Sequence, residues 1–235
     1  MIDFLNAESI VTPRGEIAKI TNAAGETIWE KVSSDFRELY QRVEFITRKA
    51  GEGWFRTDFI ANDQSGLELS FSVPSFSDTA TMGSRASGST NGRCYIFYPR
   101  AATVGYIGWN TAQSWSVSTV ANTQYTTRLN WLNCRKAVIL NADGTTKATK
   151  SVSGTLVQQT SPIDICSYNN GNGRAMSLYG ARLSQGSEIV REYLPCYRKS
   201  DGEIGLMEML TGQFVPSQVA GGFTKGADIE WGGEA

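Results

Sequence analysis

The chain has 235 residues, 40% of them hydrophobic, which suffices for one large β domain or two small ones. Its 22 basic and 23 acidic residues leave a net charge of −1, so charge gives no reason to expect nucleic acid or an anionic membrane as a partner. There is no histidine, which excludes a Ser-His-Asp triad, a Cys-His pair and a histidine-ligated zinc within the chain.

The first 34 residues are predicted to form an N-terminal β module. The segment SIVTPRGEIAKITNAAGETIWE contains short strand-like runs, and its Gly-containing NAAGE is typical of a turn between two of them. A module of this size cannot bury enough surface to be stable alone. We therefore expect it to pack on the main domain, on a copy of itself or on another protein.

The segment SSDFRELYQ is the best helix candidate in the chain. Asp35 can cap the helix, Glu38 three residues later completes a capping-box pattern, and Phe36, Leu39 and Tyr40 fall on one face. We expect a short linking helix at the start of the second domain, residues 35–235.

From about residue 43 onward the pattern predicts β-strands throughout. Alternation is strict in LELSFSV, where one face carries the apolar residues Leu67, Leu69, Phe71 and Val73. The segment AVILNADGTTKAT predicts a hairpin with Asp143-Gly144 in its turn. More than ten short strands without helices between them predict an all-β fold, a two-sheet antiparallel jelly-roll sandwich.

The four cysteines and the N-terminus both bear on where the chain is made. Cys94, Cys134, Cys166 and Cys196 show no C-x-x-C spacing, and each lies in or beside a strand-like run, which favours buried, reduced thiols over disulfides. The opening MIDFLNAESI has no basic region before an apolar run, and no apolar run approaches the roughly 18 residues of a membrane helix. We expect synthesis in a cytoplasm.

The C-terminal stretch YGARLSQGSEIVREYLPCYRKSDGEIGLMEMLTGQF resembles the closing signature of concanavalin A-like (laminin-G-like) jelly-roll domains in tail and other virion proteins of phages and prophages of gut bacteria. The opening LYQRVEFITRKAGEGWFRTDF is similar to the start of such domains, so the resemblance spans about residues 39–226. The signature is carried by Arg191, Leu194, Pro195, Cys196, Arg198, Lys199, Ser200, Asp201, Gly202, Ile204, Gly205, Thr211, Gly212, Phe214, Phe223 and Gly226.

The resemblance implies that the hairpin around RKSDGE closes the sandwich, and this hairpin is called the clasp. Asp201-Gly202 is expected to form the turn, Pro195 to end pairing on one side, and the first and last strands to lie near each other. The resemblance also implies a virion location after assembly in a bacterial cytoplasm. It further implies a symmetric homo-oligomer, a trimer, in which residues 1–34 contact sister chains or other virion proteins.

Catalytic and metal sites are not expected. A glycosidase needs a pair of carboxylates, and no strand carries a run such as E-x-D-x-x-E; the nearest approach, DIEWGGE, lies in the tail. Asp78, Asp143 and Asp164 stand alone in the sequence, so no calcium site, and no other cofactor, is expected.

Two segments are candidates for binding a glycan, because sugar rings stack on aromatic side chains while amides and hydroxyls bond their hydroxyl groups. The alternative is that half of the aromatic residues face the core and that the Asn-rich loop SYNNGNGRAM is a plain turn. The candidate residues are Tyr106, Trp109, Asn110, Trp115 and Tyr125 in the first segment, and Asn169, Asn170 and Arg174 in the second.

The sequence as a whole predicts a non-enzymatic phage virion protein, a tail-fibre or decoration protein that displays a jelly roll for host-surface or mucosal glycan binding. A purely structural virion protein without a ligand and a divergent glycosidase are the alternatives. Exposure of Trp109 and Trp115 in a shared groove would favour the glycan-binding protein, and their burial the structural one. An acidic pair facing that groove would favour the glycosidase.

Overall fold

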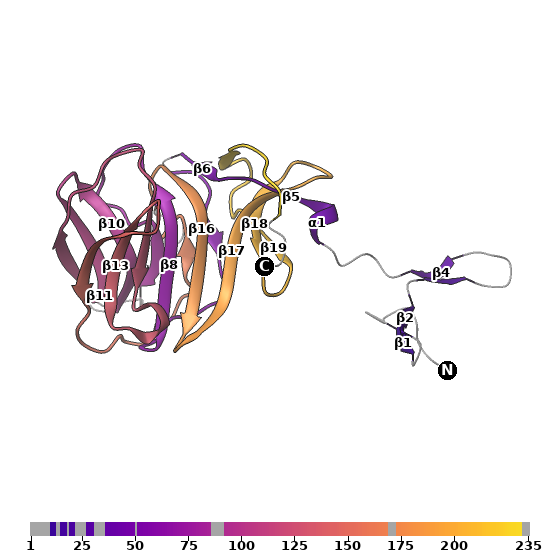
Figure 1. Cartoon of the computed structure of the whole chain (residues 1–235), viewed down its shortest axis with the longest axis horizontal. Coiled ribbons are helices and arrows are strands. Elements are labelled where there is room, and N and C mark those ends of the chain that lie inside the picture. Colours follow the sequence, from indigo (N-terminus) through magenta and orange to yellow (C-terminus); the bar gives the residue numbers. More distant parts are fainter. Residues whose placement is uncertain are drawn as a thin grey trace. The chain divides into compact units, whose positions relative to one another are not determined.

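The computed structural model describes residues 10–12, 15–17, 19–21, 27–30, 36–49, 51–85, 92–168 and 173–231. The chain divides into two units, Met1–Glu38 and Leu39–Ala235 (Figure 1). In the first unit, β1 (Ile10–Thr12) pairs with β2 (Gly15–Ile17), and β3 (Lys19–Thr21) pairs with β4 (Thr27–Glu30). The predicted NAAGE turn, residues 22–26, lies outside the described residues.

The predicted short helix is present. Helix α1 spans Phe36–Leu39, and Tyr40 is already the first residue of strand β5 (Tyr40–Arg42). The predicted cap, Asp35, lies outside the described residues. Within the part of the chain that the structure describes, no helix has the length and apolar character that a membrane crossing requires.

The second unit is a sandwich of two antiparallel sheets (Figure 1). The larger sheet has the order β14 (Thr146–Ser151), β13 (Lys136–Asn141), β12 (Tyr125–Leu129), β8 (Ser65–Ser72), β16 (Met176–Gln185), β17 (Glu188–Arg198), β18 (Ile204–Glu208) and β19 (Gln213–Pro216); β5, β6 (Ile46–Arg48) and β20 (Phe223–Lys225) join it at the side. The smaller sheet has the order β11 (Val104–Ser116), β10 (Arg93–Ala101), β9 (Met82–Arg85), β15 (Asp164–Ile165) and β7 (Phe55–Arg56). The predicted all-β jelly-roll fold is confirmed.

The core lies between the two sheets. Leu67, Leu69 and Phe71 of β8 are at most 1% exposed, and they belong to the same apolar cluster as Ile96 of β10 and Ile107 of β11. Since successive strand residues point to opposite faces, the polar residues between the three β8 positions face away from this core. The alternation in the sequence therefore assigns the faces of the sheet correctly.

The predicted clasp is present at the C-terminal end of the domain. Strand β17 pairs with β16 as far as Tyr193 and with β5 from Cys196, and Pro195 lies at this change of partner. Gly202 in the following turn has φ 75°, which a glycine adopts without strain. Strand β20 pairs with β6, so the last strand of the domain lies beside one of its first.

A buried carboxylate explains the Thr-Gly dipeptide of the signature. Glu208, 3% exposed, accepts hydrogen bonds from Thr211 N at 2.8 Å and from Thr211 Oγ1 at 2.5 Å. It also accepts one from Glu192 N at 3.0 Å, which ties the turn to the neighbouring strand β17. The turn between β18 and β19 is thereby held by one side chain, and Gly212 completes it with φ 69°.

The other predicted hairpin and the cysteines agree with the sequence except at one position. Gly144 has φ 80° in the turn between β13 and β14, where the Asp143 carboxylate accepts a hydrogen bond from Thr145 N at 3.0 Å. All four cysteines are free thiols, and burial raises the pKa of Cys94 to about 12. Cys134, however, is exposed, so its predicted burial is wrong.

Candidate functional site

Three of the five aromatic-segment candidates lie in the core, which contradicts the glycan surface predicted over them. Trp109 is 1% exposed, Trp115 7% and Tyr125 6%. The indole of Trp109 donates to Gly154 O at 3.1 Å, and the ring of Trp115 meets that of Phe97 edge-on at 5.5 Å. The physical reason is strand alternation, because Trp109 and Trp115 in β11 and Tyr125 in β12 lie on the faces of their strands that enclose the core.

The two remaining residues of that segment point outward. Tyr106 lies opposite Tyr98 of β10 in the register, and Asn110 lies opposite Arg93. Asn110 is occupied in part by the backbone, since its Oδ1 accepts a hydrogen bond from Gly92 N at 2.9 Å. The predicted surface does not exist as one face, because three of its residues lie in the core and two point outward from the smaller sheet.

The loop candidate Arg174 is also not available to a ligand. It is 3% exposed, and its guanidinium donates to the carbonyl oxygens of Pro99 at 2.8 Å and of Ser77 and Ser75. Burial lowers the pKa of Arg174 to about 10. This side chain links the backbone of separate segments. The other two candidates of this loop, Asn169 and Asn170, lie outside the described residues.

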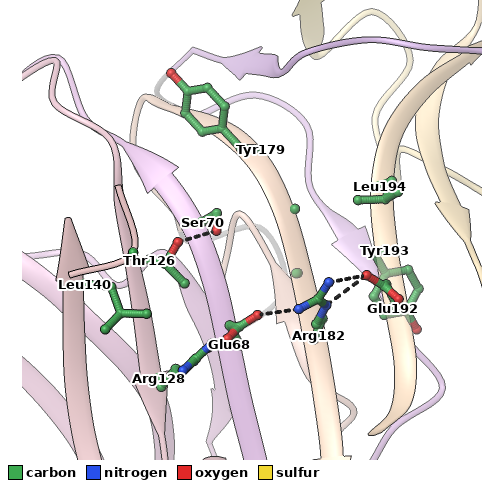
Figure 2. A pocket seen from close by; sticks show the side chains of 13 residues that line it. Glu68, Ser70, Thr126, Arg128, Leu140, Tyr179, Arg182, Glu192, Tyr193 and Leu194 are labelled. Carbon is green, nitrogen blue, oxygen red and sulfur yellow. Dashed lines mark hydrogen bonds and ion pairs between the residues drawn. The ribbon is translucent and has the colours of Figure 1, made fainter. Parts of the chain in front are cut away.

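The outward face of the larger sheet carries a row of alternating charges (Figure 2). Arg128 of β12, Glu68 of β8, Arg182 of β16 and Glu192 of β17 are direct cross-strand neighbours and are called the charged row. Arg182 Nη1 lies 3.3 Å from Glu68 Oε1, and its Nη2 lies 2.6 Å from Glu192 Oε1. Arg128 Nε pairs with the other oxygen of Glu68.

A second row, without charge, runs beside the charged row. Thr126 and Gly180 are the cross-strand neighbours of Ser70, and Leu140 is the next residue beyond Thr126. The hydroxyl oxygens of Ser70 and Thr126 are 2.6 Å apart. A Cβ at Gly180 would come no closer than 3.4 Å to its nearest neighbour, the Tyr193 carbonyl oxygen. Neighbouring atoms would therefore tolerate a Cβ at this position, and the absence of a side chain at Gly180 leaves a depression in the surface.

A β-bulge places an aromatic ring at the end of this depression. In β16, Leu178 pairs with Phe71 and Gly180 with Ser70, so Tyr179 is the extra residue between two paired positions. Bulges of this kind redirect side chains. Here Tyr179 and Gly180 both face outward although they are consecutive, and Figure 2 shows the Tyr179 ring standing above the two rows.

The two rows, the ring and their surroundings form a groove of about 300 Å³. That volume is at the lower end of the range for small-ligand sites. The groove is lined by Glu68, Ser70, Thr126, Arg128, Leu140, Gly144, Tyr179, Gly180, Ala181, Arg182, Glu192, Tyr193 and Leu194.

The charged row is electrostatically balanced. Glu68 is only 6% exposed and lies between two guanidinium groups. Burial alone would lower the pKa of Arg182, but its hydrogen bonds and ion pairs with Glu192 and Glu68 outweigh burial and raise it. With two arginines and two glutamates, the row contributes no net charge to the groove.

Part of the groove could have been found in the sequence. Glu68, Ser70, Thr126 and Arg128 are the polar positions of two alternating strands, which predicts an outward face but not their proximity. The bulge also leaves a signal, because the buried positions of β16 change from even to odd numbers between Leu178 and Ala181. Within the described residues, no group of His, Cys, Asp and Glu side chains is placed to hold a metal ion.

Comparison with known proteins adds little beyond the fold. No family model matches the chain, and no curated protein matches it. A crystal structure described as a "putative carbohydrate binding protein" from Bacteroides ovatus aligns with a TM-score of 0.47 and 11% identity, over 80% of this chain and 62% of that one. The chain thus spans less than two thirds of that protein.

Proposed function

We propose that the chain is a non-enzymatic bacteriophage virion protein, of the tail-fibre or decoration type, whose groove binds a neutral host-surface or mucosal glycan. The sequence resemblance of residues 39–226 supports the virion assignment. Trp109 and Trp115 are buried, so the criterion stated for the sequence favours a virion protein without a ligand, and the ligand class rests on the groove of the larger sheet alone. The two parts of the proposal rest on different observations and are tested separately.

The observation that carries the glycan proposal is the pairing of an uncharged depression with a row of charged hydrogen-bonding groups. A pyranose ring presents C–H groups on its faces and hydroxyls around its rim. Gly180 leaves space for a ring face, Leu140 and Leu194 offer apolar side chains on either side of it, and Tyr179 offers an aromatic side. The charged row offers carboxylate and guanidinium forks, which can each engage two neighbouring hydroxyl groups.

The balance of charge favours a neutral sugar over an acidic or basic one. Each charge of the row already has an opposite partner within hydrogen-bonding distance, so an ionic ligand would have to displace an existing ion pair. Sugar hydroxyls can instead add donors and acceptors at the rims of these pairs.

The absence of hydrolysis is part of the proposal. A glycosidase needs one carboxyl group that delivers a proton to the leaving oxygen. The two carboxylates of the groove, Glu68 and Glu192, both accept hydrogen bonds from the same guanidinium, that of Arg182. We expect no reducing-end release above buffer from a panel of polysaccharides; release that disappears in a Glu68→Gln or Glu192→Gln variant would contradict this.

A matched pair of substitutions at Gly180 tests glycan binding. Gly180→Leu should fill the depression and abolish binding to neutral oligosaccharides on a glycan array, whereas Gly180→Ala adds one methyl group at ordinary contact distance and should keep most of it. Melting temperatures of both variants control for folding. If the unaltered protein binds no glycan, or if Gly180→Leu binds as well as Gly180→Ala, the groove is a structural surface and the second candidate, a virion protein without a ligand, is favoured.

Assembly tests the virion part. We propose that residues 1–34 contact sister chains or other virion proteins and that the full chain is a homotrimer. The full chain should scatter light as an oligomer, and a chain that starts at Leu39, the first residue of the second unit, should be a folded monomer. A monomeric full chain would contradict the trimer, and location in an imaged phage particle would test the virion assignment directly.

A further inference from the structure

The outward face of the smaller sheet carries four tyrosines in contact, Tyr95, Tyr98, Tyr106 and Tyr168, called the tyrosine cluster. The ring centroids of Tyr95 and Tyr98 are 5.7 Å apart, those of Tyr95 and Tyr168 5.9 Å, and those of Tyr98 and Tyr106 6.0 Å. Tyr95 and Tyr98 form a small apolar cluster with Ala80 that is separate from the main core. None of these residues belongs to the groove of the larger sheet.

Two glycines make room for the central ring of the cluster. Gly83 of β9 and Gly108 of β11 are the direct cross-strand neighbours of Tyr95. A Cβ at Gly108 would lie 2.5 Å from Tyr95 Cδ1, and a Cβ at Gly83 would lie 2.5 Å from Tyr95 Cβ. Both distances are too short for a real contact, so the Tyr95 ring lies over Gly108, and Gly83 permits the close approach of the Tyr95 backbone.

A hollow of about 70 Å³ opens beside this ring. A water molecule occupies roughly 30 Å³ of the liquid, so the hollow has room for a small functional group and not for a whole sugar ring. It is lined by Asp78, Ala80, Arg85, Arg93, Tyr95, Tyr98 and Tyr168.

Two arginines lie side by side at the hollow, whereas the arginines of the groove alternate with glutamates. Arg85 and Arg93 are direct cross-strand neighbours, an arrangement in which like charges repel each other. The acidic residue of the lining, Asp78, lies with other partners, since Tyr98 donates to it at 3.1 Å and Arg100, outside the lining, pairs with it at 3.4 Å.

One donor at the hollow lacks an acceptor. The Nε atom of Arg93 is buried, and among the described residues it has no hydrogen-bond partner. A buried donor without an acceptor costs free energy unless a ligand or water satisfies it. An anion between the two guanidinium groups would supply that acceptor and relieve their repulsion at the same time.

We propose that this hollow binds the carboxylate group of a ligand, such as the acidic group of a uronic acid. A planar carboxylate matches the guanidinium fork of an arginine and accepts from tyrosine hydroxyls. The rest of the ligand would lie outside the hollow, against the half-buried rings of Tyr106 and Tyr168. This site is independent of the groove and of the proposed function.

The experiment compares sodium glucuronate with glucose, its neutral counterpart, on the full chain by NMR. Glucuronate and acetate should both shift the Nε–H resonance of Arg93, and glucose should not. Arg93→Gln should weaken glucuronate binding by about tenfold or more, the loss of one charge-assisted hydrogen bond, and Arg93→Lys should weaken it less. Gly180→Leu, in the groove, should leave glucuronate binding unchanged.

Three outcomes would overturn the proposal. Equal shifts with glucose and glucuronate would show that the carboxylate is not recognised. Unchanged affinity in Arg93→Gln, or in Arg93→Lys if the first variant does not fold, would place the anion elsewhere. Equal binding of sulfate and acetate would show a general anion site in place of a carboxylate site.

Discussion

On the larger sheet the charges alternate from strand to strand, whereas on the smaller sheet two arginines stand opposite each other. In the charged row every guanidinium has a carboxylate neighbour in the register, so the charges of the row neutralise one another without a charged ligand. At the hollow, Arg85 and Arg93 face each other, and Arg93 Nε has no acceptor among the described residues. In both proposals the class of ligand follows from which charges the strand register places side by side on an outward sheet face.

The glycines of the two faces also differ, and substitution of Gly108 should have the largest effect on stability. Gly108→Ala would force a methyl group into the buried Tyr95 ring and should lower the free energy of unfolding by about 2–3 kcal/mol, the cost of overpacking. Gly180→Ala, the matched change on the other face, should alter it by less than about 0.5 kcal/mol. Urea unfolding measures both, and equal effects would mean that the Tyr95 ring is free to move aside.

A glycine on neither face provides a reference for pure backbone strain. Gly202 has φ 75°, and a Cβ there would meet no atom within 4 Å. Gly202→Val should therefore cost about 2 kcal/mol through the left-handed backbone conformation alone. The melting temperature checks this, and an unchanged value would show that the turn relaxes to another conformation.

Removing the charge of Glu68 tests whether the charged row of the larger sheet contributes to stability. Glu68→Gln keeps the shape but leaves Arg128 and Arg182 without the carboxylate between them, which imitates the like-charged pair of the smaller sheet. We expect a loss of about 1.5 kcal/mol in urea unfolding, the value of hydrogen bonds to a charged group. Addition of acetate should restore part of it; a variant as stable as the original protein would mean that the row contributes nothing to stability.

Alkaline pH should give the smallest of these effects, through the buried Tyr98 of the tyrosine cluster. Burial raises the pKa of Tyr98 above its ordinary value near 10, so the unfolded chain loses this proton before the folded one. Stability contributed by the neutral Tyr98 is complete below pH about 10 and falls as the pH rises further, by about 1 kcal/mol at pH about 11. Tyr98→Phe should show a correspondingly shallower decline in urea unfolding between these pH values. Identical slopes would mean that Tyr98 ionises equally in both states.

The sequence predicted the sandwich well because the relevant signals are local. Alternation in β8 and the turn glycines Gly144 and Gly202 depend on neighbouring residues alone, and the structure agrees with all of them. The glycan surface predicted from Trp109 and Trp115 failed because aromatic composition does not reveal which strand face is inward. The positions of these two residues, both odd and in one strand, would have predicted that they share a face.

Residues and spacing by themselves determined the alternating faces of β8, the turns at Gly144 and Gly202, and the exclusion of histidine chemistry. Only the tertiary structure decided which strands became neighbours and in what register. Glu68 meets Arg128 across 60 positions of the chain and Arg182 across 114, and no local pattern encodes such a contact. The register arises when the whole sandwich closes over one core, since a shift by one residue would turn every buried face outward. The groove and the hollow are consequences of that closure.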